Sequence, residues 1–172
     1  MDLLNQLRKA HTKENCNLIV AWVNDDQKKF DELFEIFLGN DKLLVQRSSW
    51  PLSYCVEAFP FIIKKHFDSF INNLDKPIQH EAVKRHSLRM LQFLDIPKKY
   101  EGIIMNKCFD FIQDIAEKPA VKVFSLIILE RLQKRYPAIK EELQLIIETQ
   151  MEHEKAGFIS RAKKVLKSLN DL

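Results

Sequence analysis

Three serines recur 38 residues apart, at Ser49, Ser87 and Ser125. A serine hydroxyl becomes a nucleophile when a neighbouring base accepts its proton, but that chemistry needs one serine and not three. No histidine stands at a position that would support them. We therefore expect a structural role, in which a small side chain lets helices approach closely and its hydroxyl donates to the carbonyl oxygen four residues earlier.

The stretch from His80 to His86 nearly matches the zinc-binding helix motif of metalloproteases. That motif needs two histidines four residues apart, so that both face one metal ion. Here Lys84 takes the second position, and His86 would lie on roughly the opposite face of a helix. The other three histidines are isolated. We expect no metal site and treat all five histidines as surface or boundary residues.

Motifs of other enzyme classes are missing as well. The chain has no glycine-rich phosphate loop, no Gly-x-Ser-x-Gly elbow and no paired-cysteine spacing for a metal. We therefore expect a protein that is not an enzyme, with no catalytic residue, no cofactor and no bound metal.

The composition is that of a helical globular protein, since 46% of the residues are hydrophobic and 30% charged, with only three glycines. The three cysteines are odd in number and widely spaced, which favours a reducing compartment. The apolar runs are far shorter than the roughly 20 residues that span a bilayer, and residues 1–10 lack a signal-peptide core. We expect a cytoplasmic protein with no membrane segment, and the composition predicts no particular oligomeric state.

The elements that carry these residues repeat with the same period. The segment Ala82–Leu91 returns as Ala120–Leu129, and one aliphatic position recurs as Val45, Val83, Val121 and Ile159. A period in this range marks stacked supersecondary units. Amphipathic spacing and proline joints predict an N-terminal helical cap (1–24) and four helical couplets, at about 25–58, 59–96, 97–136 and 137–171.

Each couplet is expected to hold a first and a second helix. The first helices are predicted at about 25–38, 60–74, 98–114 and 138–151, and the second helices at about 41–57, 78–94, 118–135 and 156–169. Thr12 and Asp41 are predicted N-caps. Pro51 falls inside a predicted helix and should kink it or weaken its hydrogen bonding.

The second helices resemble those of HEAT repeats. Asp75–Leu91 and Glu117–Leu129 each begin with an acidic turn and a proline, continue with Val followed by Lys, and end in small and leucine positions. Residues 41–52 and 154–166 fit more loosely, because Gln46 and Ser160 replace the basic residue. The resemblance covers about residues 25–169 and implies one domain (1–172), an all-α, armadillo-like superhelix shared by proteins of many functions.

Charge is divided between the two kinds of helix. Counted over 41–58, 78–94, 118–135 and 155–169, the second helices carry 15 Lys and Arg against 4 Asp and Glu. Counted over 25–38, 60–75, 98–114 and 138–152, the first helices carry 8 against 14. In a HEAT-like stack the second helices line the concave side, so the resemblance implies a basic groove. The candidate partner-binding residues are Arg47, Lys84, Arg85, Arg89, Lys122, Arg161 and Lys164. Asp41, Asp75 and Glu117 would make the groove less positive if they pair with these cations.

Three functions are open for such a chain. The first is a non-enzymatic scaffold that binds an acidic protein partner through the basic concave groove. The second is nucleic-acid binding, as in the HEAT-like DNA alkylation-repair proteins, with a strong dependence on salt. Base excision would also need aromatic residues beside a carboxylate at the centre of the groove, for which Trp50 and Tyr54 are the candidates. Trp50 aligns with Leu88 and Leu126, which favours core packing. The third is a structural subunit that stacks end to end through Ile159, Val165, Leu166 and Leu169.

Overall fold

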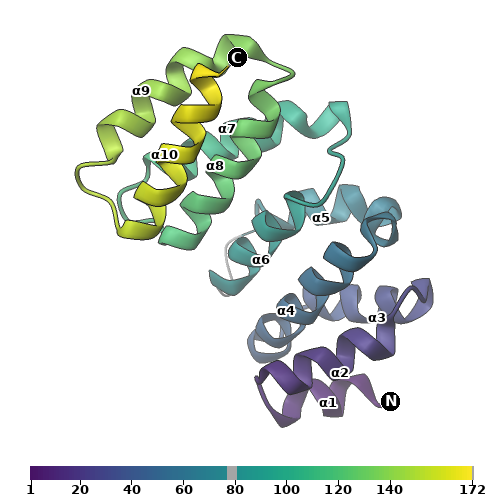
Figure 1. Cartoon of the computed structure of the whole chain (residues 1–172). Helices are drawn as coiled ribbons and strands as arrows, with labels where there is room; N and C mark the ends of the chain where they lie inside the picture. The colour runs from purple at the N-terminus through teal and green to yellow at the C-terminus, as the bar shows by residue number, and fades with distance from the viewer. Residues whose placement is uncertain (77–80, 172) are drawn as a thin grey trace. The chain divides into compact units, whose positions relative to one another are not determined.

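The structure is a computed structural model that describes residues 1–76 and 81–171. All regular secondary structure in these two ranges is helical, without any strand (Figure 1). The predicted all-α fold is therefore confirmed. The chain divides into two compact units, unit 1 (Met1–Leu94) and unit 2 (Asp95–Leu172). Among the described helices, none is long and apolar enough to cross a membrane.

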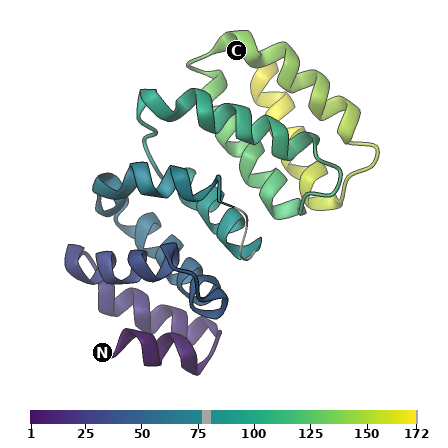
Figure 2. The ribbon, with the colours of Figure 1, turned by 180° about the vertical axis from the view of Figure 1, so that it is seen from behind.

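Unit 1 begins with a two-helix cap and continues with two helical couplets. The cap helices are α1 (Leu3–Lys9) and α2 (Lys13–Val23). The couplets are α3 (Gln27–Leu38) with α4 (Lys42–Ala58), followed by the 3-10 helix η1 (Pro60–His66) and α5 (Phe67–Asn73) with α6 (Glu81–Leu91). Helices α3 and α5 lie toward the viewer in Figure 2, whereas α4 and α6 lie toward the viewer in Figure 1. The first and second helices of unit 1 therefore form two layers.

Polar side chains mark where the first four helices begin. Asp2, Thr12, Asp26 and Asp41 each precede a helix and accept hydrogen bonds from backbone N–H groups of its first turn. Those N–H groups have no carbonyl partner within the helix, so each cap stabilises the helix start. The predicted caps at Thr12 and Asp41 are confirmed.

The first helix of the second couplet differs from its prediction. The spacing predicts one helix over 60–74, but the chain forms η1 and then α5. Pro60 has no N–H to donate. His66, where η1 ends and α5 begins, has backbone angles of φ −99° and ψ 3°, which lie outside the α-helical region. Asp31 of α3 holds His66 there, since its Oδ1 lies 2.6 Å from His66 Nε2. A tertiary contact thus interrupts the helix.

The core of unit 1 lies between its two layers. Amphipathic spacing predicts an apolar stripe on α3, and its members Phe30, Leu33, Phe34 and Phe37 are buried, whereas Leu38 is half-buried. Helix α4 packs against both α3 and α6. Its buried apolar side chains include Leu44, Val45, Leu52, Cys55 and Val56. Pro51 lies inside α4, which nevertheless continues to Ala58.

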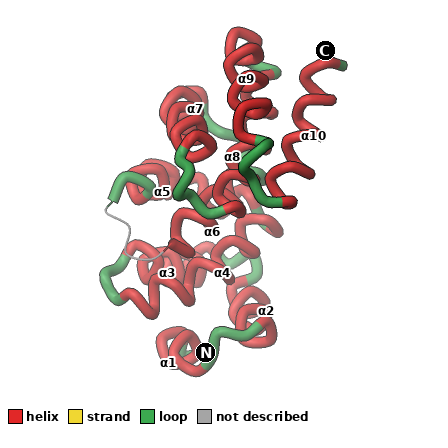
Figure 3. Tube along the Cα trace, turned by 90° about the vertical axis from the view of Figure 1, so that its left-hand side faces the viewer, coloured by secondary structure: helices red, strands yellow, loops and turns green. Residues whose placement is uncertain are grey.

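Unit 2 contains two further couplets. They are α7 (Lys98–Gln113) with α8 (Pro119–Gln133), and the 3-10 turn η2 (Pro137–Ile139) and α9 (Lys140–Gln150) with α10 (Ala156–Asn170), all drawn as red tube in Figure 3. Helix α8 packs against α7 and α10. At the joint before η2, Tyr136 Oη donates a hydrogen bond of 2.5 Å to the buried carboxylate of Glu101. The predicted proline joint is therefore fixed by a side chain from α7.

The residues with the 38-residue period occupy equivalent buried positions. Val45, Val83 and Val121 are buried, and Ile159 is half-buried. The three periodic serines are fully buried. Only one of them makes the predicted bond, from Ser125 Oγ to Val121 O at 2.9 Å. Ser49 Oγ donates instead to the carbonyl three residues back, at 2.7 Å, and Ser87 Oγ finds no partner among the described residues.

The proposed end-to-end stacking surface is largely occupied within unit 2. Val165 and Leu169 are fully buried, because α10 turns them toward the other helices of the unit. Ile159 and Leu166 are half-buried. The amphipathic pattern of 156–169 therefore reflects packing inside the unit, and it leaves little apolar surface for a further copy.

We predict that Phe34→Ala lowers the free energy of unfolding of unit 1 by about 3–5 kcal/mol, because it leaves a cavity in the core. The Phe34 ring is fully buried and stacks 4.4 Å from the His66 ring, centroid to centroid. Urea unfolding followed by tryptophan fluorescence measures this, since both tryptophans, Trp22 and Trp50, lie in unit 1.

The matched control is Phe61→Ala, because Phe61 is 52% exposed on η1. It should cost less than about 1 kcal/mol. Equal losses for the two variants would contradict the described core.

Candidate binding surface

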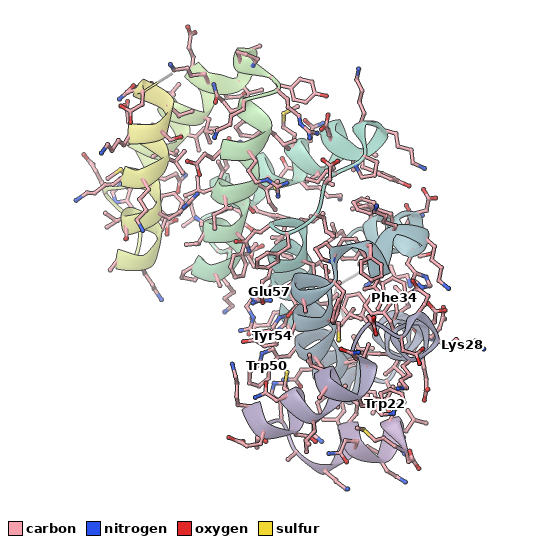
Figure 4. All side chains as sticks on the ribbon, turned by 45° about the vertical axis from the view of Figure 1, so that its right-hand side comes forward. Trp22, Lys28, Phe34, Trp50, Tyr54 and Glu57 are labelled. Carbon is pink, nitrogen blue, oxygen red and sulfur yellow. The ribbon has the colours of Figure 1, made fainter. Side chains whose placement is uncertain are left out.

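The exposed side of α4 carries a row of aromatic and charged side chains. Trp50, Tyr54 and Glu57 are spaced by four and three residues, which places them on one helix face. Figure 4 shows them in a row along α4, on the side opposite Phe34. Trp50 and Tyr54 are half-buried and Glu57 is exposed. The expectation that Trp50 packs in the core is wrong in part, although Leu88 and Leu126, with which it aligns, are buried.

Basic side chains from two other helices converge on the Tyr54 ring. Lys13 Nζ of α2 lies 4.8 Å from the ring centroid and donates a hydrogen bond of 3.1 Å to Tyr54 Oη. The Arg89 guanidinium of α6 lies 4.6 Å from the same centroid and 5.3 Å from that of Phe93. The hydrogen bond from Lys13 lowers the pKa of Tyr54. We call Lys13, Trp50, Tyr54, Arg89 and Phe93 the aromatic-basic face.

Arg89 is held in place by three groups of α4. Its Nη2 donates a hydrogen bond of 2.5 Å to Glu57 Oε2. Its Nη1 lies 3.3 Å from both the carbonyl oxygen and the hydroxyl oxygen of Ser53. Planar guanidinium groups present several donors in a fixed arrangement, so these contacts define its orientation. The Arg89 guanidinium is therefore oriented by contacts within unit 1.

His86 lies beneath this face and is buried, whereas the sequence predicts a surface or boundary residue. Its Nδ1 is 3.2 Å from Ser53 Oγ, and its Nε2 is 3.3 Å from Nη2 of Arg85. Because arginine only donates, Nε2 must accept, which assigns a neutral ring with its proton on Nδ1. Burial, followed by the charges of Arg85, Arg89 and His11, lowers the pKa of His86 to about 3.

The near-match to the zinc-binding motif at His80–His86, for which the sequence predicts no metal site, has no candidate ligand cluster around it in the described residues. Over residues 1–76 and 81–171 there is no group of three or more His, Cys, Asp or Glu side chains that could hold a metal ion. His86 is engaged with Ser53 and Arg85, and His80 lies outside the described residues.

In unit 1, the predicted partner-binding cations differ in their exposure to solvent and in the contacts they make. Arg47 donates from Nη1 to the carbonyl oxygens of Leu7 and Arg8, at 3.0 and 2.7 Å. These carbonyls belong to the last turn of α1 and have no intrahelical donor, so Arg47 joins the N-terminal cap to α4. Arg85 is exposed and Lys84 is half-buried on the neighbouring α6.

In unit 2, two of the three predicted cations form internal ion pairs. The side chain of Lys122 is only 1% exposed, and its ammonium pairs with Glu154. Arg161 of α10 pairs with Glu130 of α8. Lys164 is exposed on α10. Lys122 therefore cannot contact a partner in this arrangement, and Arg161 could do so only in competition with Glu130.

The alternative of an internal ion-pair ladder is thus realised in part, with acids other than those proposed. Arg89, Lys122 and Arg161 use Glu57, Glu154 and Glu130. Asp41 instead caps α4 through the N–H groups of Leu43 and Leu44. Each pair joins residues 31 or 32 positions apart, six or seven fewer than the 38-residue period, so the period alone did not identify them.

A comparison with protein-family models matches residues 3–169 to a model described as a HEAT repeat domain. Comparisons with curated proteins and with solved structures give no match. The family match covers both units and agrees with the helical couplets, the 38-residue period and the packing of consecutive second helices, α4 on α6 and α8 on α10.

We predict that Lys122→Met lowers the free energy of unfolding by about 3 kcal/mol, because it leaves the Glu154 carboxylate partly buried without its counterion. Urea unfolding followed by circular dichroism measures this in unit 2. Lys164→Met, on the exposed side of α10, should change stability by less than about 0.5 kcal/mol. A similar small effect for Lys122→Met would show that its ion pair is not structural.

We also predict that unit 1 loses stability as the pH falls from about 6.5 to 5. The unfolded chain has the ordinary histidine pKa of 6.5 and the folded His86 a pKa of about 3, so the unfolded state binds more protons in this window. The loss approaches about 1.4 kcal/mol per pH unit. Urea titrations followed by tryptophan fluorescence at several pH values measure it.

His86→Asn removes the titrating ring and should flatten this slope, whereas His153→Asn, an exposed control, should retain it. The Asp31 carboxyl does not interfere. Burial would raise its pKa, but hydrogen bonds from Lys65 and His66 outweigh this and lower it to about 2. An unchanged slope in His86→Asn would assign the pH dependence to other groups.

Proposed function

The chain belongs to the HEAT repeat domain family, and we propose that it is a non-enzymatic scaffold that binds an acidic protein segment on the aromatic-basic face of unit 1. HEAT repeats form helical scaffolds that typically contact other proteins, so the family supports the general role. The observation that supports this particular surface is the Tyr54 ring, which two cations contact beside a partly exposed Trp50.

The residue types of this face are those that dominate protein interfaces. Trp, Tyr and Arg side chains carry a large share of interface binding energy, because they combine extensive contact area with hydrogen bonding. Tyr54 and Arg89 are already held by hydrogen bonds within the protein. Binding would therefore cost little additional side-chain entropy.

The charges of the face favour an acidic partner. Lys13 and Arg89 belong to this face, Arg85 contacts His86 beneath it, and the carboxylate of Glu57 pairs with Arg89. Complementary charge speeds encounter and excludes basic partners. Lys84 in unit 1 and Lys164 in unit 2 stay predicted partner-binding residues under the same proposal.

Burial of the potential nucleophiles supports a non-enzymatic role. Ser53 and His86 lie close together, but both are buried and Ser53 Oγ also contacts Arg89. The three cysteines are buried free thiols, and burial raises the pKa of each to about 12. Thiols at such a pKa are poor nucleophiles at neutral pH. Unoxidised cysteines also accord with the reducing, cytoplasmic setting that we propose.

Nucleic-acid binding is the alternative, and the aromatic pair of α4 favours it. Bases stack on exposed Trp and Tyr rings while nearby cations hold phosphates. However, at least five of the seven predicted cations already have an acceptor within the protein: Arg47, Arg85, Arg89, Lys122 and Arg161. The charge that remains for phosphate groups is small, so we favour the protein partner.

The test is fluorescence anisotropy with a labelled peptide of repeated Glu-Glu-Phe, compared with a Gln-Gln-Phe peptide and with single-stranded DNA over a salt series. We expect the acidic peptide to bind best. Trp50→Ala/Tyr54→Ala should weaken its binding by about tenfold or more, because truncating interface aromatics commonly costs more than about 1 kcal/mol each.

Phe61→Ala, on η1, is the matched aromatic control and should bind like the wild type. Tighter binding of DNA than of the acidic peptide, with a steep salt dependence, would favour the alternative. Absence of binding to either probe at low salt would refute the proposed surface.

A further inference from the structure

We propose that Glu57 occupies the partner's place on Arg89. In the free protein its carboxylate binds the guanidinium, and in the complex a carboxylate of the acidic segment replaces it, with a neighbouring apolar side chain of that segment over Trp50 and Phe93. This inference rests on the proposed function and specifies how the same surface recognises its partner.

The position of Glu57 is unfavourable for α4 itself. It is the last residue but one of the helix, where the backbone dipole disfavours a negative charge, and the last turn of α4 contains no basic residue. Its compensation comes from Arg89 of α6. Among the described contacts, the hydrogen bond to Arg89 is therefore the one that holds the Glu57 carboxylate, and breaking this bond does not disrupt α4.

Arg89 keeps its position when Glu57 leaves. Ser53 accepts two hydrogen bonds from Nη1, and the rings of Tyr54 and Phe93 lie below 5.5 Å from the guanidinium. Nη2 is the group that Glu57 satisfies. Release of Glu57 thus presents a preorganised Nη2 donor to an incoming carboxylate, at little entropic cost.

The exchange is energetically accessible because the resident pair is partly solvated. The Glu57 side chain is 38% exposed and the Arg89 side chain 20%. Exposed ion pairs are weak, so Glu57 should reduce the affinity for an acidic segment only about two- to fivefold. A carboxylate is the anion that this site is already shaped to hold, which favours Asp or Glu of the partner over other anions.

The test is the Glu57→Gln variant of the full chain, titrated with the Glu-Glu-Phe peptide. We expect binding about two- to fivefold tighter than that of the wild type. Glu130→Gln is the matched control, because it removes the same kind of ion pair, with Arg161 in unit 2, and should leave peptide binding unchanged.

A double-mutant cycle with Arg89→Gln separates competition from simple charge repulsion. If Glu57 acts by occupying Arg89, Glu57→Gln has no effect in the Arg89→Gln background. An undiminished gain in that background, or no gain in the wild-type background, overturns the inference while peptide binding by the wild type still supports the proposed function. Absence of binding by both the wild type and Glu57→Gln refutes both.

Discussion

A buried cation must keep an anionic partner, and this constraint acts on the second helices of both units. Lys122 shows it most strongly, because its side chain is almost wholly enclosed and its ammonium would be very costly to bury without Glu154. Arg161 likewise pairs with Glu130, and the side chains of this pair are more exposed to solvent. Basic residues that look like a continuous binding stripe along the chain are therefore divided by depth, and depth decides which of them can meet a partner.

The ion pair of Arg89 and Glu57 is more exposed to solvent than that of Lys122 and Glu154. It is shared by two packed helices, as the pair of Arg161 and Glu130 is, but it lies among aromatic rings and is partly open to solvent. The same chemistry that stabilises the interior in unit 2 thus becomes, at the surface of unit 1, an exchangeable contact. Aromatic neighbours make the difference, because they add contact area that an isolated surface ion pair lacks.

Most of the architecture could be predicted from the sequence. The 38-residue period, the caps at Thr12 and Asp41 and the stripe of α3 are local signals, and local signals fix helix existence. The interruption at His66 could not be predicted, because it depends on Asp31 more than thirty positions away. The candidate site residues were predicted less accurately for the same reason. The burial of Lys122 and His86 and the partial exposure of Trp50 depend on neighbouring helices that periodicity does not identify.

The hydrogen bonds from Arg47 to the carbonyl oxygens of Leu7 and Arg8 in α1 also limit how the N-terminal cap can be exchanged between repeat proteins. A helix of seven residues is too short to persist alone in water, so α1 depends on its docking to α4. The guanidinium, in turn, gains its acceptors only when α1 is there. The N-terminal cap is therefore not an interchangeable module: grafting it onto another repeat array would require an arginine at the corresponding position, and exchanging it here would require a replacement that offers the same carbonyl groups.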